Sequence, residues 1–277
     1  MIPWEYLLKP ILRKYPKPGM GRRPIPAETM LRIYFLQQGY KLSDPAMEDR
    51  LYEVESMRRF AGVALDGIPD ETTICKFRHF LERHGLSESL FQRTEPYLRD
   101  RGLMIREGTI VDATIIAAPS STQNRAKARA PEMGSTKKGT TWHFGMKAHV
   151  GSDPQGRVHH VVVTSASVHD SEIMRDCLHG KERVIYGDKA YVSAERKHEA
   201  ESQGIEWRVH RKAQRNRKLT CADRSFNRKN NRVRSRVEHP FGLIKHLWGY
   251  SKVRLFALAN IYLARKELGA MIFVGTG

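Results

Sequence analysis

Three carboxylic acids in this sequence lie in settings that suit a metal ligand. Asp112 interrupts the apolar run Thr109–Ile116, and Asp188 follows a second apolar run that begins at Val184. Glu238 lies beside the most basic stretch of the chain. Carboxylates that converge within a few ångströms force one of them to stay protonated unless a cation neutralises them. Because hard divalent cations prefer oxygen ligands, we predict that these acids bind a pair of such cations.

Residues on the same predicted helix as Glu238 are suited to binding phosphate. A buried stripe with helical spacing is predicted by Val233, Val237, Phe241, Ile244 and Trp248. Steps of three, four and seven put four polar residues on another face: Asn231, Arg234, Glu238 and Lys245. In this interpretation the acid holds a metal while the cations bind phosphate oxygens. The alternative is a solvated helix with ion pairs, and Pro240 predicts a kink near residue 239.

The net charge of the chain indicates what kind of molecule it binds. The 277 residues include 48 Lys and Arg against 30 Asp and Glu, a net charge of +18. This excess predicts a polyanionic partner, nucleic acid first and an anionic membrane second. The basic residues are most concentrated in residues 208–236, which contain twelve Lys or Arg and one acid. The alternatives are a ribosome-like structural protein or a basic surface that is merely solvated.

The cysteines and the hydropathy pattern indicate the compartment. Cys75, Cys177 and Cys221 are far apart and form no C-x-x-C pair, so they indicate neither a disulfide framework nor a zinc ribbon. No apolar run reaches the ~18 residues of a membrane span, and the first residues lack a signal-peptide layout. We therefore expect a cytoplasmic, nucleoid-associated protein.

The first 103 residues predict a basic arm and a helical domain. Residues 1–25 are rich in Pro, Gly, Lys and Arg and are interpreted as an arm or connector. Residues 26–103 show helical spacing, with Asp44 and Asp70 as expected N-caps. This cluster is interpreted either as a helix-turn-helix DNA reader or as a plain helical bundle.

From residue 104 the pattern changes to strands. A buried strand is expected at 110–116, a half-buried strand at 144–151, a return strand at 158–164, and further strands at 183–187 and 205–209. A helix is expected to begin at Ser171, and another to span 193–203. The polar stretch 119–141 is interpreted as a long loop. Together these elements predict an α/β (α+β) fold with a mixed sheet and helices on its faces.

The motifs around the three acids resemble those of bacterial insertion-sequence DDE transposases. The motifs are Asp112, Gly187–Tyr191 and the spacing Arg234-x3-Glu238-x6-Lys245. The insertion-sequence-five family has a Tyr three residues before the Arg, where this chain has Asn231. Further similar blocks are Gly21–Pro26, Leu42–Met47, Ser56–Phe60, Ile68–Thr73 and Gly108–Ser121. The resemblance covers roughly residues 4–267.

This resemblance implies a fold and a mechanism. The fold is an RNase H-like, mixed five-stranded sheet flanked by helices over 104–277, preceded by a small all-helical domain. Two Mg²⁺ ions, with Mn²⁺ as a substitute, would be held by Asp112, Asp188 and Glu238. The activity would be cleavage at terminal inverted repeats followed by transfer of the 3′-hydroxyl into target DNA. A homodimer would bring both ends together in a synaptic complex.

Other residues are candidates for DNA contacts. Arg234 and Lys245 are expected to fix the phosphate backbone. Further candidates for DNA contact are Asn231, Arg236 and Lys189, with an ordinary surface lysine as the alternative for Lys189. Trp142 is expected either to stack on an unpaired base or to pack in the core. Asp170 is interpreted as part of a turn and helix cap, with contact to the site as the alternative. The alternative functions are a metal-dependent nuclease of the same fold and a decayed transposase that only binds DNA.

Overall fold

The computed structural model describes residues 2–17, 19, 23–118, 130–213, 217–243, 260 and 263–264. The chain divides into two compact units. The first, called the helical unit, runs up to Tyr97, and the second, called the sheet unit, is Leu98–Gly242. Described residues after Gly242 group with the helical unit, so the extent of the predicted catalytic domain, 104–277, stays a prediction. Within the described ranges, no helix combines the length and apolar character needed to cross a bilayer.

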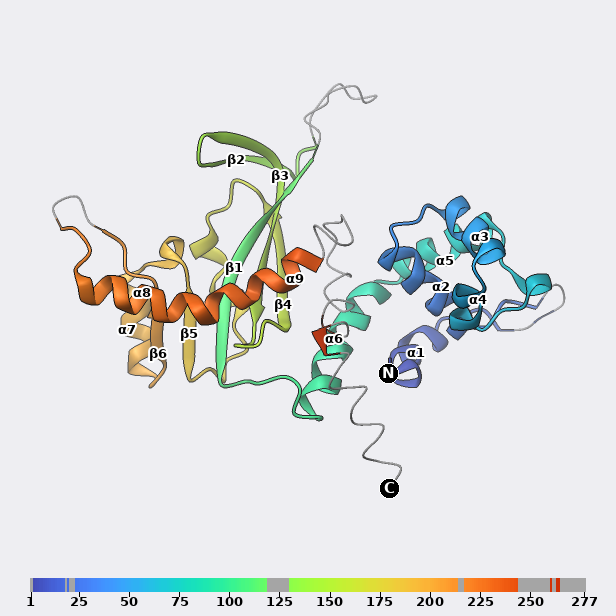
Figure 1. Ribbon diagram of the computed structural model, residues 1–277, viewed down its shortest axis with the longest axis horizontal. Coiled ribbons are helices and arrows are strands. Elements are labelled where there is room, and N and C mark those ends of the chain that lie inside the picture. Colours follow the sequence, from blue (N-terminus) through green and yellow to red (C-terminus); the bar gives the residue numbers. More distant parts are fainter. Residues whose placement is uncertain are drawn as a thin grey trace. The chain divides into compact units, whose positions relative to one another are not determined.

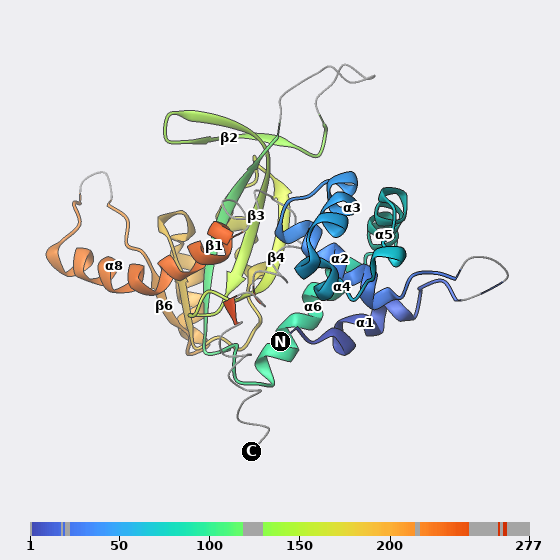
Figure 2. The ribbon, with the colours of Figure 1, turned by 45° about the vertical axis from the view of Figure 1, so that its right-hand side comes forward.

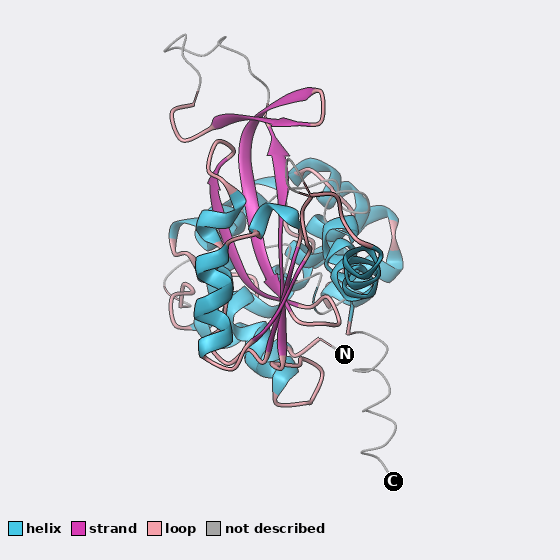
Figure 3. Cartoon of the chain, turned by 90° about the vertical axis from the view of Figure 1, so that its left-hand side faces the viewer, coloured by secondary structure: helices cyan, strands magenta, loops and turns pink. Residues whose placement is uncertain are grey.

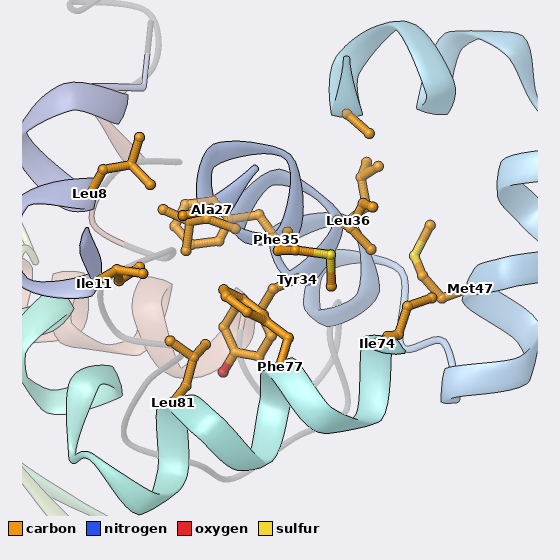
Figure 4. Close-up of a cluster of buried hydrophobic side chains, with 14 of the residues drawn as sticks. Leu8, Ile11, Ala27, Tyr34, Phe35, Leu36, Met47, Ile74, Phe77 and Leu81 are labelled. Carbon is orange, nitrogen blue, oxygen red and sulfur yellow. The ribbon is translucent and has the colours of Figure 1, made fainter. Parts of the chain in front are cut away.

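The helical unit consists of short helices around one apolar core (Figures 1 and 4). Their bounds are α1 (Trp4–Leu12), α2 (Ala27–Gly39), α3 (Asp44–Glu53), α4 (Glu55–Ala61), the 3₁₀ turn η1 (Leu65–Gly67), α5 (Glu71–Arg83) and α6 (Leu86–Arg99). α2 lies at the centre and buries residues on all sides, including Leu31 and Tyr34. α5 turns Ile74, Phe77 and Leu81 towards it, which are the positions that the three-and-four spacing predicted. The prediction of a helical region is confirmed.

Side-chain caps fix where two of these helices begin. Asp70 accepts a hydrogen bond from the Thr73 backbone N–H at 2.6 Å, as predicted for an N-cap of α5. The prediction for Asp44 is wrong by one position, because Ser43 is the N-cap of α3. The Asp44 carboxylate instead pairs with the Arg78 guanidinium of α5 at 2.8 Å. Asp44, which the local sequence predicted as the cap, therefore forms a tertiary ion pair instead.

The predicted arm over residues 1–25 is wrong for Trp4–Leu12, which forms α1. This helix buries Leu7, Leu8 and Ile11, and the Trp4 ring lies 5.4 Å from the Phe35 ring of α2. Its Pro and Lys content suggested an extended connector, but burial of these apolar side chains outweighs the weak helical propensity.

The described residues of the sheet unit form six strands in one mixed sheet. They are β1 (Gly108–Ala117), β2 (Gly134–Lys138), β3 (Thr141–Ser152), β4 (Val158–Ser165), β5 (Val184–Gly187) and β6 (Glu206–Val209). Five of them follow the order β4-β3-β1-β5-β6, in which β3 is antiparallel to β1 and to β4. β1, β5 and β6 run parallel to one another. This is the predicted RNase H-like arrangement.

The sixth strand corrects the prediction of five strands and of a loop over 119–141. β2 pairs with the first part of β3 and forms a two-stranded ribbon that projects beyond the other strands (Figures 1 and 2). Its Gly, Ser, Thr and Lys residues lack the apolar alternation by which a strand is recognised. Residues 119–129 of the predicted loop lie outside the described residues.

Helical segments cover both faces of the sheet unit's strands, which Figure 3 views along their edge. Val111 and Ile185 point to one face, where they pack with Ala200 of α7 (Ala194–Ser202). The helix expected from Ser171 is replaced on this face by two 3₁₀ turns, η2 (Asp170–Ile173) and η3 (Arg175–Cys177). The other face carries α8 (Cys221–Arg234), which crosses β5 and β1 in Figure 1.

The helix that carries Glu238 is not continuous. α8 ends at Arg234, the 3₁₀ turn η5 spans Ser235–Val237, and α9 is Glu238–Gly242. A break was predicted near 239, and it occurs a few residues earlier. Pro240 has no N–H to donate to the carbonyl four residues before it, so the regular helix is lost in the preceding turn.

Candidate active site

Parallel pairing of β1 and β5 brings two of the three candidate acids to the same level. Ile110 pairs with Tyr186, and each acid lies two residues further along its strand. Residues two apart on a strand share a face. Asp188 keeps an extended backbone, with φ −83° and ψ −174°, so this alternation continues past the end of β5. Asp112 and Asp188 therefore project from the same face of neighbouring strands.

The segment after β5 holds Asp188 in place through its own turn. Its carboxylate accepts a hydrogen bond from the Ala190 backbone N–H at 2.8 Å and caps the 3₁₀ turn η4 (Lys189–Tyr191). Gly187 allows the chain to approach closely, because a Cβ there would lie 3.3 Å from side-chain atoms of Tyr191 and Val111. The turn thus anchors one carboxylate oxygen and leaves the other available to a ligand.

Asp112 is a mostly buried carboxylate whose charge is incompletely compensated. Its two oxygens accept hydrogen bonds from the Ala113 backbone N–H at 2.9 Å and from Arg234 at 3.0 Å. Burial nevertheless raises the pKa of Asp112 to about 6, with Asp188 and Asp170 adding to the rise and Arg234 opposing it. The ionised form of Asp112 is therefore disfavoured, chiefly by burial, even with Arg234 present.

Arg234 connects the third acid to the sheet. Its guanidinium lies 3.0 Å from the Asp112 carboxylate and 3.7 Å from the Glu238 carboxylate. The Arg234 side chain is 17% exposed, whereas that of Glu238 is 64% exposed. Within the described residues, no three His, Cys, Asp or Glu side chains are gathered closely enough to hold a metal ion. Two of the three acids are therefore linked through a guanidinium.

Two further residues neighbour the site: His210 was not predicted as a site residue, whereas for Asp170 contact with the site was the alternative to a role in a turn and helix cap. Asp170 pairs with Lys147 at 2.9 Å and lies close enough to influence the pKa of Asp112. His210 follows β6, and its backbone N–H donates to the Gly187 carbonyl at 3.0 Å. Burial lowers the pKa of His210, and the charges of Arg234 and Asp188 act on it. The sequence signal that could have identified both residues was their position after a predicted strand.

The other predicted DNA contacts are spread over the sheet unit. Asn231 and Lys189 are exposed beside the acids, and the Asn231 side-chain oxygen faces Arg234 at 3.4 Å. Arg236 is exposed and donates to the Pro154 carbonyl at 2.8 Å. Trp142 lies on the projecting ribbon and is 67% exposed, which rules out the alternative that it packs in the core. Lys245 lies outside the described residues.

The turn between β3 and β4 packs against the junction of α8 and α9. Asp153 is fully buried and accepts hydrogen bonds from the backbone N–H groups of Ile105, Gln155 and Arg157. Gly156 has φ +86°, and a Cβ there would lie 2.4 Å from the Arg236 carbonyl oxygen. The backbone of the turn thus fixes the chain two residues before Glu238.

Residues 104–265 match the family model described as Transposase DDE domain. The chain belongs to this family of DDE transposases. Residues 1–80 match a second model, described as Transposase domain (DUF772). The DDE domain assigns the chain a role in DNA transposition with nucleolytic transposase activity, and DDE transposases generally use divalent metals.

Two solved structures resemble this DDE transposase. One is a cryo-EM structure of the piggyBac transposase synaptic complex with hairpin DNA, at a TM-score of 0.48 and 11% identity over 95% of this chain and 71% of that one. The other is a crystal structure of the Mos1 strand transfer complex, at a TM-score of 0.23 and 11% identity, over 82% of this chain and 83% of that chain.

Proposed function

We propose that this transposase cuts DNA at the terminal inverted repeats of an insertion sequence and joins the ends to target DNA. Hydrolysis at each end frees a 3′-hydroxyl, which then attacks a phosphodiester bond of the target. The observation that carries the proposal is the placement of Asp112 and Asp188 at one level of the sheet, with Arg234 connecting Asp112 to Glu238. The motif spacing supports a place in the insertion-sequence-five family.

The residues of the site fit divalent cations. Asp112, Asp188 and Glu238 offer only carboxylate oxygens, the ligands that Mg²⁺ prefers. Burial raises the pKa of Asp112, and a cation bound beside this carboxylate would offset the cost of ionising it. We assign Asp112, Asp188 and Glu238 as the residues that would hold the two Mg²⁺ ions. Bound Mg²⁺, or Mn²⁺ in its place, lowers the pKa of water and stabilises charge on phosphate oxygens.

The cations around these acids are proposed to bind the DNA backbone. Arg234 offers a bidentate fork for a phosphate once its carboxylate partners bind metal. Lys189, Asn231 and Arg236 are exposed close to the acids and would contact neighbouring phosphates, and Lys245 has the same proposed role. Such contacts position the duplex and do not read its sequence.

The exposed Trp142 is proposed to stack on an unpaired base. Its indole projects from the ribbon with the Lys137 ammonium 6.0 Å from the ring centroid. Neither strand of the outer ribbon, Gly134–Met146, contains an acidic residue. An exposed aromatic face beside a cation suits a nucleotide, which offers a base to the ring and a phosphate to the lysine.

The full chain with Mg²⁺ is expected to nick a supercoiled plasmid that carries the element's inverted repeats and to join the freed ends to a second plasmid. A homodimer is the expected active form, because both ends must be cut together. Asp188→Asn should lower nicking strongly but keep DNA binding, since asparagine can still cap the turn after β5. Asp176→Asn, on the exposed turn η3, is the matched control.

The remaining outcomes separate the alternative functions. Cutting without joining would indicate a nuclease of the same fold. DNA binding without cutting would indicate a transposase that has lost its chemistry. Equal cutting by Asp188→Asn and the wild type would refute the assigned site.

A further inference from the structure

The side of α8 that faces the sheet unit is fixed by specific contacts. Thr220 and Asp223 form a capping box at its first turn, and Asp223 also pairs with Arg211 at 2.6 Å. Asn227 exchanges two hydrogen bonds with the Arg211 backbone, at 2.8 and 3.0 Å. The Asn230 side chain donates to the Arg208 carbonyl at 3.2 Å. The helix therefore has one defined orientation, and its other side is held towards solvent.

The solvent side of α8 is a stripe of unpaired cations. Arg224, Arg228 and Arg232 follow one another at intervals of four residues, with Lys229 beside them, and all four are exposed. Residues four apart are neighbours on a helix surface, so these like charges repel one another. No acid of the described residues lies within ion-pair distance of any of the four, and the helix's single acid, Asp223, is turned towards Arg211. We call these four residues the α8 stripe.

The spacing of the α8 stripe suits a nucleic-acid backbone. A helix rises 1.5 Å per residue, so Arg224 and Arg232 are about 12 Å apart along the axis, a length of three to four base pairs. A duplex along this side could meet successive cations with successive phosphates. α8 ends at Arg234, which pairs with Asp112 and Glu238, so a backbone that follows this helix to its end reaches the candidate site.

We propose that the α8 stripe binds the phosphate backbone of duplex DNA and leads it to Glu238. This inference rests on the proposed function and extends it by naming the surface along which the DNA approaches. Bound phosphates would neutralise the repulsion among the four cations. In the free protein that repulsion remains, so the α8 stripe is expected to lower the folding stability while it raises the affinity for DNA.

The test compares the full wild-type chain with a variant in which all four stripe residues are changed to Gln. The probe is a labelled duplex of about three helical turns and arbitrary sequence, titrated in EDTA over a range of KCl concentrations. Each lost phosphate contact should lower the slope of log K against log [KCl] by about 0.9, so a fall of roughly three to four is expected. Affinity near 0.1 M salt should fall on the order of 10²-fold or more.

A matched control removes exposed cations elsewhere. Lys181→Gln with Arg183→Gln lies at the amino end of β5, the end opposite Asp188, and should leave the slope unchanged. The stripe variant should melt at the same temperature as the wild type or higher, because like-charge repulsion is removed. A lower melting temperature would assign the four residues a structural role and overturn the proposal.

Other probes decide between partners. An unchanged slope in the stripe variant, or an equal fall in the control, would overturn the proposal. So would stripe-dependent binding only to single-stranded DNA of the same length or only to anionic lipid vesicles. Because the titration involves no cleavage, failure to nick DNA would count against the proposed function and leave this result standing.

Discussion

The candidate site joins two regions that hold their acids by different means. Asp112 and Asp188 come from the sheet, where the pairing of β1 with β5 sets their level and their face. Glu238 comes from a broken helix and is held by one ion pair to Arg234. The sheet-borne acid Asp112 is largely buried and costly to ionise, whereas Glu238 is largely solvated. Burial of Asp112 therefore favours a bound cation beside the sheet, whereas Glu238 faces the site from an exposed position.

The largest effect should come from neutralising a carboxylate that the sheet positions. Asp188→Asn should lower the nicking rate by roughly 10³-fold, because losing a metal ligand forfeits several kcal/mol of transition-state stabilisation. Gel assays of supercoiled plasmid measure this rate. If Glu238→Gln cost more activity than Asp188→Asn, the helix rather than the sheet would be the main support of the site.

The second-largest effect should come from removing Arg234, which links Asp112 to Glu238. Arg234→Gln should lower the free energy of unfolding by about 2 kcal/mol in EDTA, because the Asp112 carboxylate loses its buried partner. Excess MgCl₂ should stabilise this variant more than it stabilises the wild type, since the cation replaces the missing positive charge. Urea unfolding with and without MgCl₂ measures both effects. An equal magnesium effect in both proteins would show that Arg234 and the metal do not share a site.

Neutralising the buried acid should stabilise the metal-free chain. The pKa of Asp112 is raised from 3.8 to about 6 in the folded state, so the ionised group costs stability above that pH. Asp112→Asn should therefore add about 1–2 kcal/mol at neutral pH in EDTA. The gain should shrink as the pH falls from about 6 towards 3.8, where the carboxyl protonates in the folded chain. A gain independent of pH would contradict the burial argument.

The smallest effect should come from the exposed acid. Glu238→Gln should change the free energy of unfolding by no more than ~0.5 kcal/mol, since exposed ion pairs contribute little. Unfolding curves in EDTA test this directly. A loss of unfolding free energy as large as that of Arg234→Gln would contradict the small contribution expected from an exposed ion pair.

The sequence predicted the parts of this molecule that depend on local patterns. Apolar, β-branched runs located β1, β4 and β5, and therefore the strand ends that carry Asp112 and Asp188. The spacing of Ile74, Phe77 and Leu81 located α5 and its buried face. These patterns repeat every two residues or every three to four, and each reflects burial along one element.

Features that depend on contacts between distant residues were missed. The ion pair between Asp112 and Arg234 joins residues 122 positions apart, which no periodicity reveals. The proximity of Asp170 depends on two 3₁₀ turns that replaced an expected helix. β2 was missed because its pairing with β3, rather than apolar side chains, makes it a strand. The catalytic roles of the three acids stay predictions.

The two turns of the antiparallel strands differ in how well they should tolerate added residues. The turn at Gly156 has no room for even a methyl group against the Arg236 carbonyl, although a hairpin turn is ordinarily a forgiving place for insertions. A reporter inserted there would displace the start of α9 and carry Glu238 with it. At Gly139, on the tip of the ribbon, a Cβ would meet no atom of the described residues within 4 Å, so this turn offers a safer attachment point.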